Sequence, residues 1–413
     1  MVSKMNFSKI GILPRVILAI ILGMTLGPYV GQAFVRSFAT FNGLFGQLLA
    51  FAVPLIILGL VAPGIAELGR SGGRLLAVTV LLAYTSTVFA GWFSYSSCSV
   101  IFPKLLGIAG ESIGQTVAVG ENAHDALNLL PSFFTIAIPP PLDVMTALIL
   151  AFVFGIGMAV TGSEALKRTF TESRDIIELL IVKVIVPLLP LHIFGLFLNM
   201  ANSGAAVRII GDFGKVIGVI FVLHVTLLLI QFTVAGLVAR RNPLTMLWKM
   251  LPAYMTALGT ASSAATIPVT LASAKKLGIR NDVADFCIPL CATIHLSGSM
   301  LKITGTALAI CLMHGMPHDP ALFAGFIMLL GVMMVAAPGI PGGAIMAATG
   351  LLQSSLGFDN AQIGLMIAIY LAIDSFGTAG NVTGDGAIAV IVDRFAGKRM
   401  ISDTLNDGRA VTP

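Results

Sequence analysis

Runs of about 20 apolar residues recur along the whole chain, and this feature constrains the fold more than any other. A helix of that length crosses a hydrocarbon core about 30 Å thick. Only 10% of the 413 residues are charged, whereas a soluble domain carries about 25%. The sequence therefore predicts an all-α membrane protein with many spans. The net charge of +5 fits basic loops beside a lipid bilayer and gives no reason to expect nucleic acid as a partner.

Six apolar segments fill the first part of the chain and alternate with basic residues. The segments cover residues 12–35, 41–66, 75–103, 142–162, 176–202 and 208–239. Every second boundary is basic, with Lys4, Lys9 and Arg15, then Arg70 and Arg74, then Lys167, Arg168 and Arg174, and finally Arg240 and Arg241. Because lysine and arginine gather on the cytoplasmic side of a membrane, both ends of this six-span block are expected in the cytoplasm.

The apolar runs after residue 241 are interrupted by small polar residues, glycine and proline. Segment 244–274 contains "GTASSAATIPVTLAS" and has basic residues at both ends, so we expect it to dip into the membrane and return. Segment 320–357 contains "APGIPGGAIMAATG" and must also return if the basic residues after span eight (360–392) are cytoplasmic. Two re-entrant helical hairpins of opposite orientation, each followed by a span, form an inverted repeat typical of secondary transporters. A kinked helix and a loop between two short spans are the alternatives.

This pattern predicts eight transmembrane helices plus two re-entrant hairpins in a bacterial cytoplasmic (inner) membrane, with both termini in the cytoplasm. Polar residues inside the last two spans mark its functional core. Asp374, Asn381 and Asp385 are spaced to share one helix face, and His295 and Lys302 are spaced to share a face of span seven (282–313). Buried carboxylates require a cation, which could be a metal ion, a substrate ammonium or a protein side chain such as Lys302 beside Asp385.

Four motifs, "SSAATIPVT", "PLCATIHLSGS", "PGIPGGAIM" and "DSFGTAGNVTGD", follow in this order. Together they resemble the dicarboxylate/amino acid:cation symporter family, which includes glutamate transporters and neutral amino acid exchangers. The resemblance implies a homotrimer of elevator-type transporters. Residues 1–241 would form mainly the scaffold and trimer contacts, with span three partly in the moving domain. Residues 242–397 would form the transport core, and residues 398–413 a cytoplasmic tail. No cofactor is implied beyond a coupling ion, Na⁺ or H⁺.

The resemblance also implies which residues bind the substrate. The hairpin tips and Asn381 would hold its carboxylate, and Asp374 its amino group. The other implied pocket residues are Ser262, Ser263, Ser299, Ile340, Pro341, Gly342, Gly377 and Thr378. Acidic amino acid transporters of the family carry an arginine at the position of Gly377, and a guanidinium grips a second carboxylate in a bidentate manner. Because glycine cannot, we expect a small neutral amino acid, unless Thr378 or a basic group elsewhere replaces the arginine.

The cation-binding signature departs from that of the family. A stretch that usually reads Asn-Met-Asp-Gly-Thr is here residues 295–299, HLSGS, with His295 and Ser297 at the ligand positions. Hard cations prefer oxygen ligands, so one sodium site is expected to be lost, while sodium could still bind at Thr293, Asn381 and Asp385. We hypothesise that His295 and Lys302, the latter beside Asp385, replace sodium and couple transport to protons. A static pair that holds spans seven and eight together is the alternative.

Three other functions remain open: a sodium-coupled symporter of dicarboxylates or acidic amino acids, an uncoupled exchanger or channel-like member of the family, and an intramembrane enzyme. The enzyme has the least support, because the sequence contains no HExxH motif. Cys291 and His295 have the spacing of a helical Cys–His pair, but ordinary packing explains them better. We therefore expect a transporter and no enzyme.

Overall fold

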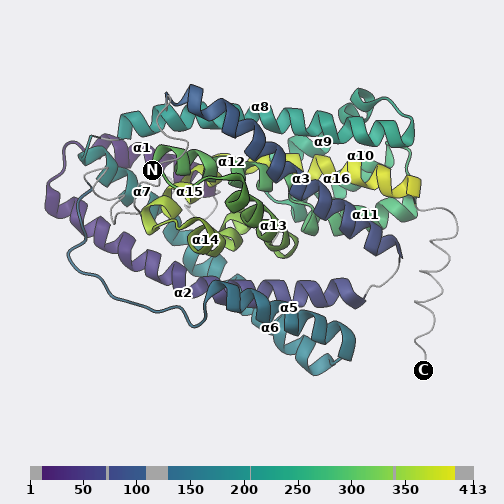
Figure 1. Ribbon diagram of the computed structural model, residues 1–413, viewed down its shortest axis with the longest axis horizontal. Coiled ribbons are helices and arrows are strands. Elements are labelled where there is room, and N and C mark those ends of the chain that lie inside the picture. The colour runs from purple at the N-terminus through teal and green to yellow at the C-terminus, as the bar shows by residue number, and fades with distance from the viewer. Residues whose placement is uncertain (1–11, 71–73, 108–128, 205, 338–340, 396–413) are drawn as a thin grey trace, which may run out of the picture.

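The computed structural model describes residues 12–70, 74–107, 129–204, 206–337 and 341–395. Helices joined by short turns account for every regular element in these ranges. In the view of Figure 1, the long helices α2 (Gln32–Arg70) and α8 (Ala206–Ala239) border the molecule, and the shorter helices of the C-terminal half lie between them. The predicted all-α class is confirmed.

The first half of the chain consists mainly of long apolar helices. Besides α2 and α8 they are α1 (Ile12–Leu26), α3 (Arg74–Leu105), α5 (Val144–Thr161) and α7 (Val186–Asn202). The amphipathic helix α6 (Glu164–Leu180) is joined to α7 by a π-helical turn, η2 (Ile181–Ile185). Across the described residues, five helices are long and apolar enough to cross a membrane, or six if the bent pair α15 and α16 counts as one span. Large apolar side chains such as Val160, Leu237 and Trp248 are exposed on the outer helices, as lipid contact requires.

The run 244–274 forms two helices, α9 (Pro243–Thr260) and α10 (Ser263–Lys275), which pack against each other. Helix α9 ends at Ala261, whose φ of 49° lies in the left-handed region, and Ser262 begins α10 by accepting a hydrogen bond from the Ala265 N–H. The break therefore falls within the small polar motif, as predicted. Because the two helices pack along each other, they form a hairpin and not a kinked helix.

The run 320–357 forms a second pair of helices that pack together, α13 (Pro320–Ala336) and α14 (Gly343–Leu356). Gly342 precedes α14 with a φ of 76°, a conformation that glycine adopts without strain. The other tip residue implied by the family resemblance, Ile340, lies outside the described residues.

Spans seven and eight are each broken into two helices. Helices α11 (Asn281–Ile294) and α12 (Ser297–Met313) are separated at His295 and Leu296, where the backbone leaves helical geometry. His295 and Lys302 therefore do not lie on one continuous helix, although both side chains contact the last span. Helices α15 (Asn360–Ala372) and α16 (Asp374–Phe395) meet at an angle of 62°. Residues Ser297 to Cys311 of α12 are all buried, and so is most of α16, so the two breaks lie inside the protein.

Candidate functional site

Four buried ionisable side chains form two pairs beside the breaks in spans seven and eight. His295 and Lys302 are 1% exposed, Asp374 is 6% exposed and Asp385 is completely buried. His295 comes from the break between α11 and α12, Lys302 from α12, and both aspartates from α16. Buried charges are costly unless they are paired and hydrogen-bonded. Each carboxylate has a basic partner from span seven.

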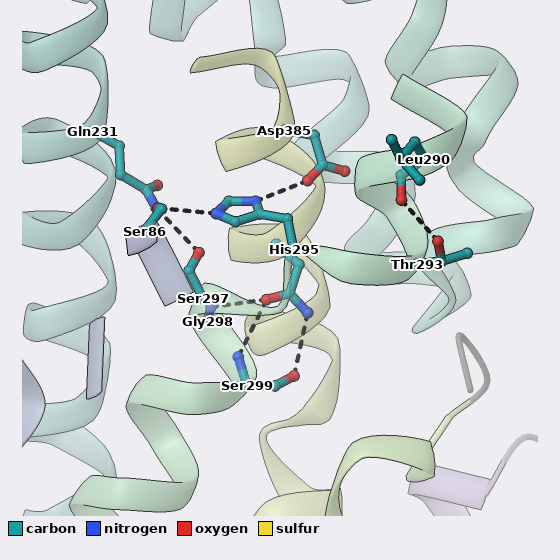
Figure 2. Close-up of polar contacts among 10 residues, drawn as sticks. Ser86, Gln231, Leu290, Thr293, His295, Ser297, Gly298, Ser299 and Asp385 are labelled. Carbon is teal, nitrogen blue, oxygen red and sulfur yellow. Dashed lines mark hydrogen bonds and ion pairs between the residues drawn. The ribbon is translucent and has the colours of Figure 1, made fainter. Parts of the chain in front are cut away.

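The first pair joins His295 to Asp385. The Nδ1 atom of His295 lies 2.9 Å from Oδ1 of Asp385, and its Nε2 atom lies 3.0 Å from the Ser86 hydroxyl of α3. Figure 2 shows the imidazole between these two partners. Gln231 of α8 donates from Nε2 to Ser86 at 3.0 Å and to Ser297 at 3.1 Å. All these bonds are satisfied when Ser86 donates to a neutral imidazole whose Nδ1–H donates to an ionised Asp385.

The second oxygen of Asp385 is the unsatisfied acceptor of this network. Among the described residues, Oδ2 of Asp385 is buried and has no hydrogen-bond partner. An ionised carboxylate beside a neutral imidazole leaves a net charge of −1 in the protein interior. One added proton, on either group, brings the pair to zero.

The second pair joins Lys302 to Asp374. The Nζ atom of Lys302 lies 2.7 Å from Oδ1 of Asp374, and the backbone N–H of Gly342 donates to Oδ2 at 2.8 Å. The same ammonium lies 3.4 Å from the centre of the Tyr370 ring, within the range of a cation–π interaction. The sequence analysis placed Lys302 beside Asp385, and this is wrong. Lys302 instead meets Asp374, the first residue of α16.

Asn381 lies between the two pairs and fixes the start of α12. Its Oδ1 atom accepts hydrogen bonds from the N–H groups of Gly298, at 2.8 Å, and Ser299, at 3.2 Å. Its Nδ2 donates to the Ser299 hydroxyl, which in turn lies 3.1 Å from the Tyr370 hydroxyl. The first N–H groups of a helix have no partner within the helix. Asn381 supplies that partner, and so its carboxamide oxygen is already occupied.

Gly377 lies against the end of the Lys302 side chain. A Cβ atom at position 377 would lie 2.6 Å from Nζ, 2.7 Å from Cε and 3.0 Å from Cδ of Lys302. The space beside Gly377 therefore holds a cation that comes from α12. A basic side chain thus lies next to the position at which acidic amino acid transporters of the family are expected to carry an arginine.

The other predicted substrate residues lie at the start of α10, before α14 and in α16. Ser262 begins α10, and Ser263 is buried in its first turn. Of the second hairpin tip, Gly342 contacts Asp374 directly and Pro341 is half-buried beside it. Thr378 is buried one residue after Gly377. These assignments stay predictions.

The three residues predicted for sodium each have a hydrogen-bond partner within the protein. Thr293 is exposed, and its hydroxyl donates to the Leu290 carbonyl at 2.7 Å, as Figure 2 shows. The Asn381 oxygen holds the start of α12, and the imidazole holds one oxygen of Asp385. Within the described residues, no group of three or more histidines, cysteines, aspartates or glutamates could hold a metal ion.

Gln231 and His224 were not predicted from the sequence as residues of this site. Both project from α8, where the His224 Nε2 atom lies 3.0 Å from the Gly298 carbonyl and Gln231 contacts Ser297. Their spacing of seven residues in an apolar helix places them on one face. That spacing is the signal that could have identified them.

Broken helices with buried charges at the breaks, enclosed by long apolar helices, define a multi-pass membrane protein with an internal polar site. The profile of the sodium:dicarboxylate symporter family matches residues 12–395. The chain therefore belongs to this family and is a membrane transporter, as its four motifs indicated.

Two relatives illustrate the range of similarity. The serine/threonine transporter SstT of Acinetobacter baumannii is 29% identical over 405 residues, which cover 94% of this chain and 97% of the relative. The serine/threonine transporter SstT of Bifidobacterium adolescentis is 26% identical over 407 residues, which cover 94% and 91%.

Proposed function

We propose that this protein is a secondary transporter of a small neutral amino acid, of the serine and threonine type, in which protons replace some or all of the sodium coupling. The names of the relatives support the substrate class. The observation that carries the coupling proposal is the buried His295–Asp385 pair. A proton added to this pair changes its charge from −1 to zero, which is the change that a bound sodium ion would produce.

The hydrogen bonds around His295 would transmit the uptake of a proton by the His295–Asp385 pair to a neighbouring helix. His295 connects α3, through Ser86, to α16, through Asp385. Protonation of the imidazole makes Nε2 a donor, so the Ser86 hydroxyl must stop donating to it and turn to another acceptor. Uptake of a proton would thus change the contact between α3 and α16.

The architecture proposed for this activity follows the family resemblance. Residues 242–397, with part of α3, would move as a transport core against a scaffold formed mainly by residues 1–241, in an elevator mechanism. The two helix pairs α9–α10 and α13–α14 would be its re-entrant hairpins. The protein would act as a homotrimer in a bacterial inner membrane with both termini in the cytoplasm.

A sodium-coupled symporter of dicarboxylates or acidic amino acids is the second candidate. The Lys302 ammonium beside Gly377 favours it, because a cation at this place is available to a second carboxylate. The engagement of that ammonium with Asp374 weighs against it.

Uptake by the purified protein in proteoliposomes tests the proposal. We expect an inward proton gradient to drive accumulation of labelled serine or threonine without sodium, and succinate and aspartate to compete poorly. Accumulation driven by a sodium gradient and insensitive to a proton gradient would refute the coupling proposal. Transport of succinate or aspartate but not of serine, threonine or alanine would refute the substrate class.

A further inference from the structure

We propose that the Lys302–Asp374 ion pair is itself the receptor for a zwitterion: the substrate ammonium replaces Lys302 at Asp374, and the substrate carboxylate then pairs with Lys302. This inference rests on the proposed function and assigns Lys302 as the residue that binds the substrate carboxylate. It also explains selection for a neutral amino acid by charge alone.

Both oxygens of Asp374 have a partner in the structure, since Lys302 donates to Oδ1 and the Gly342 N–H donates to Oδ2. A second ammonium beside this one buried carboxylate would leave a positive charge without a counter-charge, so we expect the substrate ammonium to take the place of the lysine. A buried ammonium that loses its partner is strongly destabilising. The other carboxylate at the site, Asp385, is held by His295. The anion that receives the displaced lysine must therefore arrive with the substrate.

The surroundings of Lys302 allow this exchange. Its flexible four-carbon chain rests against Gly377, where the missing Cβ leaves room for the ammonium end. The Tyr370 ring lies 3.4 Å from Nζ, so the lysine keeps one favourable contact while it turns away from Asp374. Tyr370 is held through Ser299 to Asn381, which makes it a fixed platform.

Charge balance then sets the specificity. A zwitterion that enters a neutral ion pair forms two ion pairs and leaves the total charge at zero. An amine without a carboxylate would leave the Lys302 ammonium without an anionic partner. A carboxylate without an amine would add a negative charge beside Asp374. An acidic amino acid likewise adds a negative charge for which the described residues at this pair offer no further cation.

Three ligands related by single groups test the idea: serine, ethanolamine, which lacks the carboxylate, and glycerate, which has a hydroxyl in place of the ammonium. Their dissociation constants are measured on the purified full-length wild type and on Lys302→Met and Asp374→Asn. We expect the wild type to bind serine at least tenfold more tightly than the other two. We expect Lys302→Met to weaken serine binding at least tenfold, while ethanolamine binds at least as tightly as it does to the wild type. We expect Asp374→Asn to weaken serine binding at least tenfold and to strengthen glycerate binding.

Control variants separate charge from folding. Lys302→Arg keeps the cation and should bind serine more tightly than Lys302→Met. Lys215→Met removes a lysine that pairs with Asp212 on α8, away from the pair, and should leave all three affinities unchanged. If Lys302→Met does not fold, the glycerate gain in Asp374→Asn and the serine affinity of Lys302→Arg decide the question.

Serine affinity within threefold of wild type in Lys302→Met, or no gain for glycerate in Asp374→Asn, would overturn the inference and leave the proposed function intact. Failure of the wild type to bind or transport any neutral amino acid would instead refute the proposed function.

Discussion

The Lys302 ammonium fills the space that any side chain at position 377 would need. A Cβ on Gly377 would lie 2.6 Å from Nζ, which is closer than real Cβ contacts come. The absence of a side chain at Gly377 on α16 therefore leaves the space in which Lys302 on α12 forms its ion pair with Asp374.

The first prediction concerns this steric match. Gly377→Ala should push Lys302 away from Asp374, lower the free energy of unfolding by about 1–3 kcal/mol, as overpacking does, and weaken serine binding. Thermal unfolding of the purified variant measures the first effect, and ligand titration measures the second. Because the clash involves the lysine end, the double variant Gly377→Ala with Lys302→Ala should lose less stability than the two single changes sum to. Additive losses would show that the two residues do not interact.

The second prediction concerns protons. His295→Gln keeps a polar side chain between Ser86 and Asp385 but removes the imidazole that accepts a proton. We expect serine uptake by the wild type to be driven by an inward proton gradient and uptake by His295→Gln to be insensitive to it. Proteoliposomes with a clamped membrane potential separate the proton gradient from voltage. Equal stimulation of both proteins by the gradient would assign the coupling to another group.

The third prediction concerns the carboxylate of the same pair. Asp385→Asn retains an oxygen that accepts from Nδ1 of His295 and changes the volume little, so the protein should fold with a melting temperature near that of the wild type. The asparagine cannot take up a proton, and the pair no longer changes from −1 to zero. We expect gradient-driven uptake to fall at least tenfold while exchange of internal for external serine is less affected. Loss of both activities in equal measure would indicate a structural role for Asp385.

The fourth prediction concerns the start of α12. Asn381→Ala removes the acceptor of the Gly298 and Ser299 N–H groups, so α12 should lose about 0.5–2 kcal/mol of stability, the usual cost of a lost helix cap. Hydrogen exchange should become faster at these two amides. Asn381→Asp keeps an oxygen that accepts these hydrogen bonds, so exchange at the Gly298 and Ser299 amides should stay slow. Unchanged exchange in Asn381→Ala would mean that the first turn of α12 is held by other contacts.

The fifth prediction concerns Thr293. Its side chain is exposed and bonded to the Leu290 carbonyl, so Thr293→Val should leave serine uptake and its response to sodium within about twofold of the wild type. Uptake at graded sodium concentrations measures this. A large shift in the sodium dependence of uptake would show that Thr293 contributes to a sodium site.

Local sequence signals predicted the elements well, because such signals act over a few residues. The small polar motif before Ser263 and the glycine-rich motif before α14 both mark real helix breaks. Span seven is different, since "CATIHLSGS" holds neither proline nor a glycine at the break, and the helix ends at His295. Asn381, supplied by another helix, holds the restart of the helix at Gly298 and Ser299.

The sequence by itself determined that the chain is a helical membrane protein of this family, because apolar length and motif order are written along the chain. It also identified the four ionisable residues of the site, since charges in apolar helices stand out. Only the tertiary structure decided which base meets which acid. Lys302 meets Asp374 and His295 meets Asp385, across two helices that are far apart in the sequence. Such pairings depend on how whole helices pack, and residue spacing along a single helix cannot specify them.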